Sequence, residues 1–482
     1  MLDLRPVGYV IGLLVALLGA SMLVPLVVDF ALGDGNWQAF AEASVITLAC
    51  GGFVTVACAN SLGRGLNVRQ AFVLTVGVWL ALSFFGALPF VLGAPGLTAT
   101  DAIFEAVSGI TTTGSTVIVG LDDLPAGMNL WRGMLNWLGG LGIAFVAMIF
   151  LPVMRVGGMQ FFRTEGFDTL GKVLPRATDI ARALMSVYAG MTLLCVLTYL
   201  ALGMVPLDAV VHGFATIATG GFSPSDSSFG KYPGAAEYAG AFFMLLGSLP
   251  YIRFVQMVNG TPGAVWNDAQ VRALLRWLVY AVATVVLWRM ATSDQAFEPV
   301  LREALFNLVS IFTGTGFFSG SFAGWGSFAL VAAFVVGMIG GCSGSSSGAL
   351  SVFRVQVLFA AIGAQIRQIH TPHRVFSVRY DGRTVEVDVM NALMMYVTGY
   401  VLTIGVLSVG LTLTGVDTVS AVFGIWTSIG NIGYAIGPLT APAGTFDAFP
   451  TAAKWLMILA MLMGRLALLA VFVLVLPRFW RA

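Results

Sequence analysis

Four short apolar segments along this chain each run into a turn of small residues built around a glycine, and the turns recur at similar intervals. The turns are Thr111–Ser115, Ile217–Gly221, Thr313–Phe317 and Ser428–Gly433. Aligned on Gly114, Gly220, Gly316 and Gly433, they lie 106, 96 and 117 residues apart. Repeats at a nearly constant spacing indicate copies of one structural unit. Four copies of one loop in a single chain predict a pore with four quarters around one axis.

The composition places these units in a membrane. Hydrophobic residues make up 58% of the 482 residues and charged residues only 10%, a balance that soluble domains do not show. Windows of about twenty apolar residues mark helices that cross a bilayer. They lie near residues 7–32, 40–61, 70–94, 129–153, 180–203, 236–258, 271–290, 325–348, 390–414 and 452–476. The first window is too long for a signal-peptide core and is interpreted as a retained span.

Shorter apolar segments lie between some of these spans and end at the glycine turns. They cover 101–113, 206–218, 299–312 and 417–429. Segments of this length are typical of re-entrant helices. We therefore predict an all-α polytopic membrane protein with four pseudo-repeats of spanning helix, pore half-helix, filter loop and spanning helix around one central pore, preceded by two extra transmembrane helices. The predicted units are the two N-terminal helices, 1–68, and pore repeats at 69–179, 180–270, 271–388 and 389–482.

Basic residues predict the orientation in the membrane. With the N-terminus inside, 18 of the 24 Lys and Arg residues fall on the cytoplasmic side, in agreement with the positive-inside rule. The N-terminus and C-terminus are both expected in the cytoplasm, and all four half-helices re-enter from outside. Two inner loops, 154–179 and 354–388, carry much of this charge, and Asp381-Gly382 predicts a small hairpin over 375–389.

The glycine turns are candidate ligands for a bare cation. Irregular backbone at membrane depth is tolerated where it lines a water-filled cavity or is buried in protein, and rings of backbone carbonyls replace the hydration shell of K⁺. Each half-helix also points its negative C-terminal end at its turn. The predicted K⁺ ligands are the carbonyls of Thr112, Thr113, Gly114, Ala218, Thr219, Gly220, Gly314, Thr315, Gly316, Asn431, Ile432 and Gly433. The alternative, that these small residues only permit close helix packing, explains one turn better than four.

Acidic residues lie at or near the start of each half-helix: Asp101, Asp208, Glu303 and Asp417. An external cation-attracting ring is one interpretation. Complementing the positive helix end is the better one.

Two further features predict a gate. Arg465 lies within the last span, where a charge is costly and usually faces a cavity; as a barrier below a cation filter it is preferred over a structural ion pair. A run of small residues interrupts the span after the third turn. It is interpreted as a break that obstructs or opens the pore, and the alternative is simple packing. The run is Gly340, Gly341, Cys342, Ser343, Gly344, Ser345, Ser346, Ser347 and Gly348.

Other chemistry has little support. No lysine follows the glycine-rich run, so it does not match a phosphate-binding loop. Histidines 212, 370 and 373 lack metal-ligand partners at suitable spacing, and His212 is interpreted as a packing residue. The four cysteines, Cys50, Cys58, Cys195 and Cys342, are interpreted as packing residues without disulfides. No catalytic set is present, so we predict that the protein is not an enzyme, and we expect no nucleic-acid partner.

These motifs resemble the TrkH subunit of bacterial potassium uptake systems, in the superfamily of KtrB and the plant HKT transporters. The resemblance covers nearly the whole chain. The four turns resemble the four filter loops of that family, and Trp137–Gly142, Gly340–Gly348 and Gly464-Arg465-Leu466 also match. Two helices before the first repeat are similar to TrkH rather than KtrB.

The resemblance implies a K⁺-selective uptake pathway in the bacterial inner membrane, with a homodimer and one pore per subunit. It implies that Gly340–Gly348 is an intramembrane gate with Arg465 beneath the filter, and that Gly114 goes with potassium preference. It also implies a cytoplasmic TrkA-like regulatory subunit, so that a nucleotide (NAD or ATP/ADP) acts only through that partner and no cofactor is covalently bound. A sodium-permeable or sodium/proton-coupled symporter is the alternative. An alternating-access transporter of organic solutes is remote, because it predicts two inverted halves.

Three positions depart from the family pattern. Ala349-Leu350-Ser351 stands where the family usually has a Lys after the gate glycines. Ala467 stands where Glu is common, which leaves Arg465 without a local partner. Tyr434-Ala435 stands where the fourth loop often has Pro-Gly.

Overall fold

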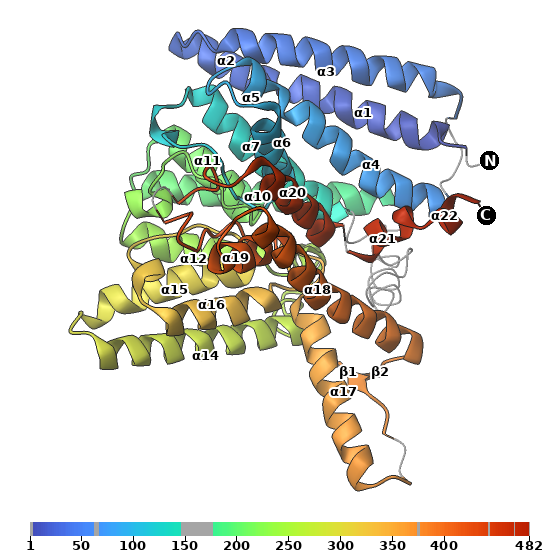
Figure 1. The fold of residues 1–482 in the computed structure, drawn as a ribbon, viewed down its shortest axis with the longest axis vertical. Coiled ribbons are helices and arrows are strands. Elements are labelled where there is room, and N and C mark those ends of the chain that lie inside the picture. Colours follow the sequence, from blue (N-terminus) through green and yellow to red (C-terminus); the bar gives the residue numbers. More distant parts are fainter. Residues whose placement is uncertain are drawn as a thin grey trace.

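The computed structural model describes residues 3–61, 67–145, 177–373, 376–441, 444–466 and 468–481, and the regular structure in this part of the chain is almost all helix (Figure 1). Two short antiparallel strands, β1 (Arg379–Tyr380) and β2 (Arg383–Thr384), pair around Asp381-Gly382. The centre of the predicted hairpin is therefore confirmed, although helix α18 already begins at Val387. Residues 146–176, which include most of the predicted inner loop 154–179, lie outside the described ranges, as does Ala467.

Two leading spans precede the repeats, as predicted. Helices α1 (Arg5–Ser21) and α2 (Leu23–Leu32) together form one apolar span, and α3 (Trp37–Ala57) forms the second. They cross closely because Gly51 packs on the backbone of Gly12 and Ala16. Small residues at a helix crossing let two backbones approach in this way.

The rest of the chain repeats one pattern of long helix, half-helix, loop and helix. The first repeat contains α4 (Val68–Gly86), α5 (Leu88–Leu92), α6 (Ala99–Ile110), η2 (Leu121–Asp123) and α7 (Ala126–Phe145). The second contains α10 (Ala177–Ala201), α11 (Pro206–Ile217), η5 (Ser228–Lys231), α12 (Ala235–Gly247) and α13 (Tyr251–Val258). The third contains α14 (Ala269–Thr292), α15 (Phe297–Thr313), η6 (Phe322–Gly324), α16 (Ser327–Ile339) and α17 (Val352–His370). The fourth contains α18 (Val387–Leu413), α19 (Thr418–Ile429), α20 (Thr451–Arg465), α21 (Leu469–Val475) and α22 (Pro477–Arg481).

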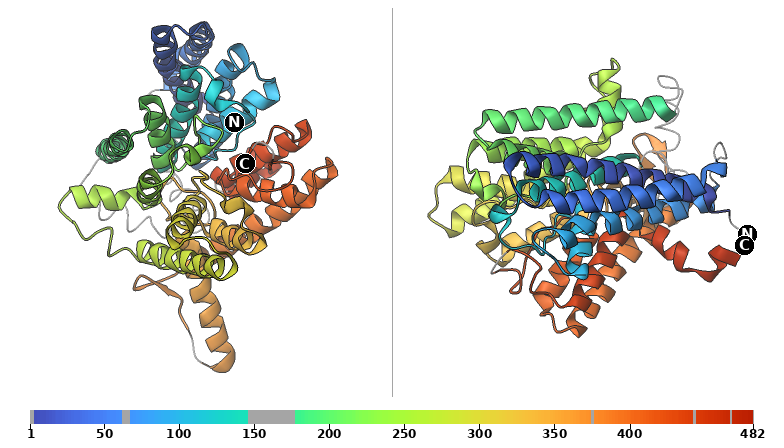
Figure 2. Two further views of the ribbon diagram at one scale, coloured as in Figure 1. Left: turned by 90° about the vertical axis from the view of Figure 1, so that its left-hand side faces the viewer. Right: turned by 90° about the horizontal axis from the view of Figure 1, so that it is seen from above.

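The repeats lie around a common centre in the order of the sequence, as the left view of Figure 2 shows. The half-helices α6, α11, α15 and α19 supply much of the buried core, and α17 projects away from the body (Figure 1). The four-repeat architecture expected from the glycine turns is therefore confirmed.

Six described helices are long and apolar enough to cross a membrane, or seven if the bent pair α12 and α13 counts as one span. Three predicted spans are not continuous. The span at 236–258 bends by 90° before Pro250, which cannot donate a helix hydrogen bond. The span at 325–348 ends at Ile339, before Gly340 with its positive φ of 72°, and the last span breaks after Arg465. The span at 129–153 is described only to residue 145.

The acidic residues of the half-helices mostly follow the helix-end interpretation. Asp417 is the N-cap of α19 and accepts a bond from Ser420 N at 3.1 Å, while Asp101 and Asp208 lie in first turns. For Glu303 the interpretation is wrong, because α15 begins at Phe297 and the Glu303 carboxylate instead accepts bonds from Ser321.

Candidate ion pathway

All four half-helices end in the same hydrogen-bonded turn. In each turn one backbone amide donates to the carbonyl of the residue five positions earlier, at 2.8–2.9 Å. The donors are Thr113, Gly220, Thr315 and Ile432, and the acceptors are Ser108, Ala215, Ser310 and Thr427. Because the same bond closes each turn, these four donors are structurally equivalent.

The backbone angles give the register of the four turns. The residue before each donor has positive φ, and so does the glycine after it. The first set is Thr112, Thr219, Gly314 and Asn431, with φ between 50° and 71°. The second is Gly114, Gly221, Gly316 and Gly433, with φ between 72° and 86°. The alignment on Gly220 is therefore wrong by one residue: Gly221 is the equivalent of Gly114, and Ala218 is the C-cap of α11. Adjacent glycines leave this choice open in the sequence, because both permit positive φ.

The equivalent glycines pack in a closed ring. A Cβ added to Gly114 would overlap the carbonyl oxygen of Gly220 in the second turn, and one added to Gly221 would overlap that of Thr315. A Cβ on Gly316 would overlap the oxygen of Ile432, and a Cβ on Gly433 would overlap that of Thr113 in the first turn. Each turn thus presents a carbonyl to the next around the circle. The predicted residues of all four turns are brought together, with the corrected register in the second.

The register makes a prediction about the adjacent glycines. Gly221→Ala should impair ion uptake far more than Gly220→Ala, because Gly221 has positive φ and abuts the backbone of Thr315. A Cβ added to Gly220 would instead lie 2.5–2.9 Å from atoms of the Asn136 side chain. A side chain can move aside more readily than a ring carbonyl. Rubidium uptake normalised to membrane-inserted protein is the measurement, and equal loss in both variants would contradict the register.

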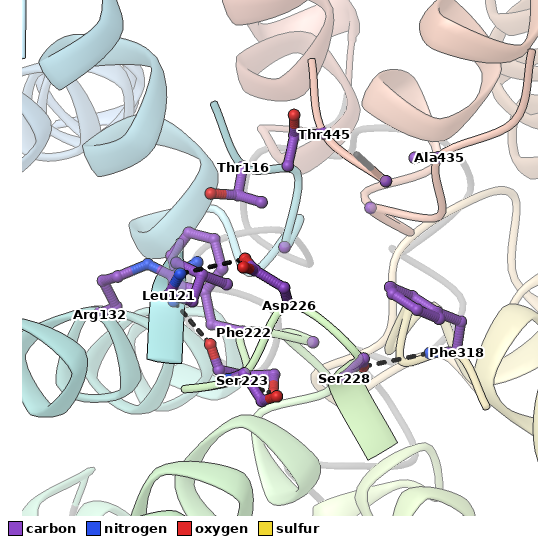
Figure 3. Close-up of a pocket in the computed structure, with 16 residues that line it drawn as sticks. Thr116, Leu121, Arg132, Phe222, Ser223, Asp226, Ser228, Phe318, Ala435 and Thr445 are labelled. Carbon is purple, nitrogen blue, oxygen red and sulfur yellow. Dashed lines mark hydrogen bonds between the residues drawn. The ribbon is translucent and has the colours of Figure 1, made fainter. Parts of the chain in front are cut away.

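A cavity of about 40 Å³ lies beyond the ring and is bordered by all four of its glycines (Figure 3). Arg132, Phe222, Asp226 and Phe318 contribute to its wall. Asp226 is held there by bonds from the amides of Gly120 and Leu121. This cavity is one mouth of the ring, on the side of the segments that follow the turns.

A buried ion pair supports the first two turns from behind. Arg132 Nε donates to Glu105 Oε1 at 2.8 Å, and both side chains are at most 1% exposed. Glu105 also accepts bonds from the segment after the first turn, from Thr116 Oγ1 and Val117 N. Arg132 Nη1 donates to Ser223 O after the second turn, at 2.7 Å. Sequence reasoning missed this pair. The signal was a Glu inside an apolar half-helix and an Arg near the start of the next helix.

The ion pair predicts a stability effect. Glu105→Gln would leave the guanidinium of Arg132 buried without its charge partner, and breaking a buried pair typically costs about 3–5 kcal/mol. A lower midpoint of thermal unfolding in detergent is expected. Glu298→Gln is a matched control, because Glu298 also pairs with an arginine, Arg302, but its side chain is 61% exposed. If both variants melt at the same temperature, the buried pair is not stabilising.

Charged groups also join the first two repeats. Lys231 Nζ lies 3.0 Å from Asp208 and 3.3 Å from Asp122. Burial disfavours the charge on Lys231, but the hydrogen bond and charge of Asp208 outweigh burial and raise the pKa of Lys231. Burial also disfavours the charge on Asp122, yet bonds from the Asp226 amide, Ser225 and Lys231 lower the pKa of Asp122. Both groups therefore keep their charge at neutral pH, and the repeats stay joined there.

The Gly340–Gly348 loop lies against the C-terminal ends of three half-helices, α11, α15 and α19. Ser346 Oγ donates to Ile217 O at 3.1 Å, and Ser347 Oγ donates to Thr313 O at 2.6 Å. Gly348 abuts the carbonyl of Gly430. Ser351 stands where the resemblance predicts a Lys. Its amide donates to Ile339 O at 2.7 Å and so closes the base of the loop. The loop therefore contacts the carbonyl ends of these three half-helices.

Arg465 joins this loop to the first turn. Its Nη2 donates to Thr112 Oγ1 and to Ser346 O, both at 2.6 Å. The predicted filter residue, gate loop and arginine are thus in direct contact. Both acceptors are neutral oxygens, which replace the local partner that the sequence lacks at position 467.

The histidine and the cysteines considered in the sequence differ in how deeply they are buried. His212 is buried, as a packing residue should be, and its ring nitrogens lie 2.8 Å from Asp208 O and 3.1 Å from Ser223 Oγ. Cys195 and Cys342 are also buried, but Cys50 is exposed, so the packing interpretation is wrong for Cys50.

Comparisons with known proteins agree with this arrangement. Residues 36–481 match the family model of TrkH, described as a cation transport protein. The chain is 40% identical to the Trk system potassium uptake protein TrkI of Halomonas elongata, covering 99% of this chain and 97% of that protein. It is 34% identical to the Trk system potassium uptake protein TrkH of Escherichia coli, covering 99% of both. The crystal structure of the potassium transporter TrkH from Vibrio parahaemolyticus matches all of both chains, with a TM-score of 0.92 and 31% identity.

Proposed function

This chain belongs to the TrkH family of cation transport proteins, and on that premise we propose that it takes up potassium through a K⁺-selective pathway along the axis of the four turns. The closed ring of turns is the observation that carries the proposal. Four equivalent carbonyls, from Thr113, Gly220, Thr315 and Ile432, each lie against the glycine of a neighbouring turn. A ring of backbone oxygens takes the place of the hydration shell of a bare cation without adding a net charge.

The ligands that we propose for K⁺ are the backbone oxygens of the three central residues of each turn. They are Thr112-Thr113-Gly114, Thr219-Gly220-Gly221, Gly314-Thr315-Gly316 and Asn431-Ile432-Gly433. The half-helices direct the negative ends of their dipoles at the same place. Ten of these twelve residues are buried, and Gly114 and Gly221 are half-buried, so most of their oxygens are shielded from competing water except along the axis.

The Gly340–Gly348 loop is the gate in this proposal. Its hydroxyls bind the carbonyls of Ile217 and Thr313 that would otherwise attract a cation below the filter. Arg465 adds a positive charge at the same level and holds the loop through Ser346. Opening requires these bonds to break, which makes the arrangement a closed state.

The family and the surface support a proposal for the membrane setting and the partners. We place the protein in the bacterial inner membrane with both termini in the cytoplasm, as a homodimer that works with a TrkA-like nucleotide-binding subunit. Helix α17 projects from the body (Figure 1) and carries an apolar stripe suited to a protein partner. The exposed stripe consists of Phe359, Ile362, Ile366 and Ile369.

Ion flux into proteoliposomes of purified protein tests the function directly. Gradients of potassium, rubidium, sodium and lithium are compared, without a proton gradient and then with one. Potassium and rubidium flux far above sodium flux is the expected result. Equal sodium flux would replace the proposal with a sodium-permeable pathway, and dependence on a proton gradient would replace it with a symporter. If a strain lacking other potassium uptake is not rescued by membrane-inserted protein, with the regulatory subunit present, the proposal fails.

A further inference from the structure

Tyr434 follows the filter glycine of the fourth turn and differs in kind from its equivalents. The corresponding residues in the other turns are Ser115, Phe222 and Phe317. Tyr434 is only 2% exposed, and its hydroxyl donates to Asn307 Oδ1 at 2.9 Å. Asn307 lies on α15, the half-helix of the third repeat, 127 residues away in the sequence. The bond therefore joins the fourth turn to the neighbouring quarter of the ring.

Asn307 is a fixed point for this bond. Its Nδ2 donates to Glu303 O and Ser319 O, each at 2.8 Å, and its Oδ1 also accepts from Ser319 N at 3.2 Å. With the Tyr434 bond, both donor hydrogens and both acceptor positions of the amide are used. Asn307 is fully buried, and a satisfied buried network holds its members in one geometry. The same amide thus holds the exit of the third turn and the exit of the fourth.

The fourth turn is held at its inner end by a different side chain. Asn431 Nδ2 donates to Thr113 Oγ1 of the first turn at 2.9 Å. The carbonyl of Ile432, which abuts Gly316, lies between these two attachments.

We propose that the Tyr434 hydroxyl is a positioning group for ion discrimination: through Asn307 it holds the Ile432 carbonyl at the spacing that favours K⁺ over Na⁺. The inference rests on the proposed function, since it assigns a role within the same filter. When the hydroxyl is absent, the exit of the fourth turn loses its attachment to the third repeat. The Ile432 oxygen then follows a smaller ion inward, and sodium is rejected less well.

Tyr434→Phe tests this role because it removes only the hydroxyl. The ring fits, since phenylalanine occupies the equivalent position in the second and third turns. The K⁺/Na⁺ flux ratio in proteoliposomes is expected to fall by roughly two- to tenfold, the factor that corresponds to the net contribution of one hydrogen bond. Tyr400→Phe is the matched control. Tyr400 is 1% exposed, and its hydroxyl has no hydrogen-bond partner in the described part of the chain.

The outcomes separate this inference from the function on which it rests. A wild-type protein that does not discriminate between the two ions overturns the proposed function, whatever the variants do. A selective wild type with an unchanged ratio in both variants overturns the role of Tyr434. Lower total flux at an unchanged ratio also overturns it, since that is the signature of a purely structural residue. A lower ratio in Tyr434→Phe alone supports it.

Discussion

Replacing Gly316 with alanine is expected to abolish selective potassium uptake. Gly316 has a φ of 86°, and an added Cβ would overlap the carbonyl oxygen of Ile432. A left-handed conformation costs a residue with a Cβ about 1–2 kcal/mol, and the overlap comes in addition. Because the obstacle is backbone rather than a flexible side chain, the ring itself must open. We expect uptake to fall by at least about tenfold, since each 1.4 kcal/mol corresponds to that factor.

Rubidium uptake per membrane-inserted protein measures this loss, and the ratio of rubidium to sodium flux shows whether discrimination is lost as well. Gly230→Ala is the matched control. Gly230 lies in η5 outside the ring, and the atoms nearest to an added Cβ there are 3.9 Å or more away. Wild-type uptake and selectivity in Gly316→Ala would show that the four carbonyls are not the filter.

Replacing Arg465 with glutamine is expected to increase ion flux in the absence of a regulatory subunit. The substitution removes the positive charge next to the ring. It also removes the hydrogen bonds that the guanidinium donates to Thr112 and Ser346. Two charge-assisted bonds are lost, each typically about 1.5–3 kcal/mol. The free energy that holds the loop in its closed position falls by a similar amount. A rise in basal flux of roughly tenfold or more is therefore expected.

Arg465→Lys separates the two contributions of this residue. Lysine keeps the charge but lacks the planar fork of donors. If charge alone forms the barrier, the lysine variant should remain closed. If the link between the loop and the first turn matters, it should leak as the glutamine variant does. Arg478→Gln on exposed α22 is the control for loss of a basic residue near the C-terminus. Unaltered or lower flux in well-assembled Arg465→Gln would contradict the barrier role.

The half-helices show how far local sequence predicts this fold. The four short apolar segments were placed within a few residues of α6, α11, α15 and α19. The break at Gly340 was also predicted, and α16 ends at Ile339. These features depend on short-range properties: the apolar length needed to cross a bilayer, and the backbone freedom of glycine. Continuous helices at 236–258 and 452–476 were predicted wrongly, because apolar content alone does not reveal a bend.

The side-chain contacts along the pathway could not be predicted from local sequence. Arg465 bonds to residues 353 and 119 positions away, and Tyr434 bonds to Asn307 across 127 positions. The choice between Gly220 and Gly221 also depended on packing, because only Gly221 lies against Thr315 of the next turn.

Apolar length, glycine spacing and charge distribution can be read along the chain without its three-dimensional packing. They were enough to place this chain in a membrane as four repeats around a pore. Only the tertiary structure decided which glycine lies against each carbonyl. It also decided which oxygens Arg465 contacts and how the fourth turn is attached. These contacts join residues that are distant in the chain, so their geometry arises only when all four repeats pack together.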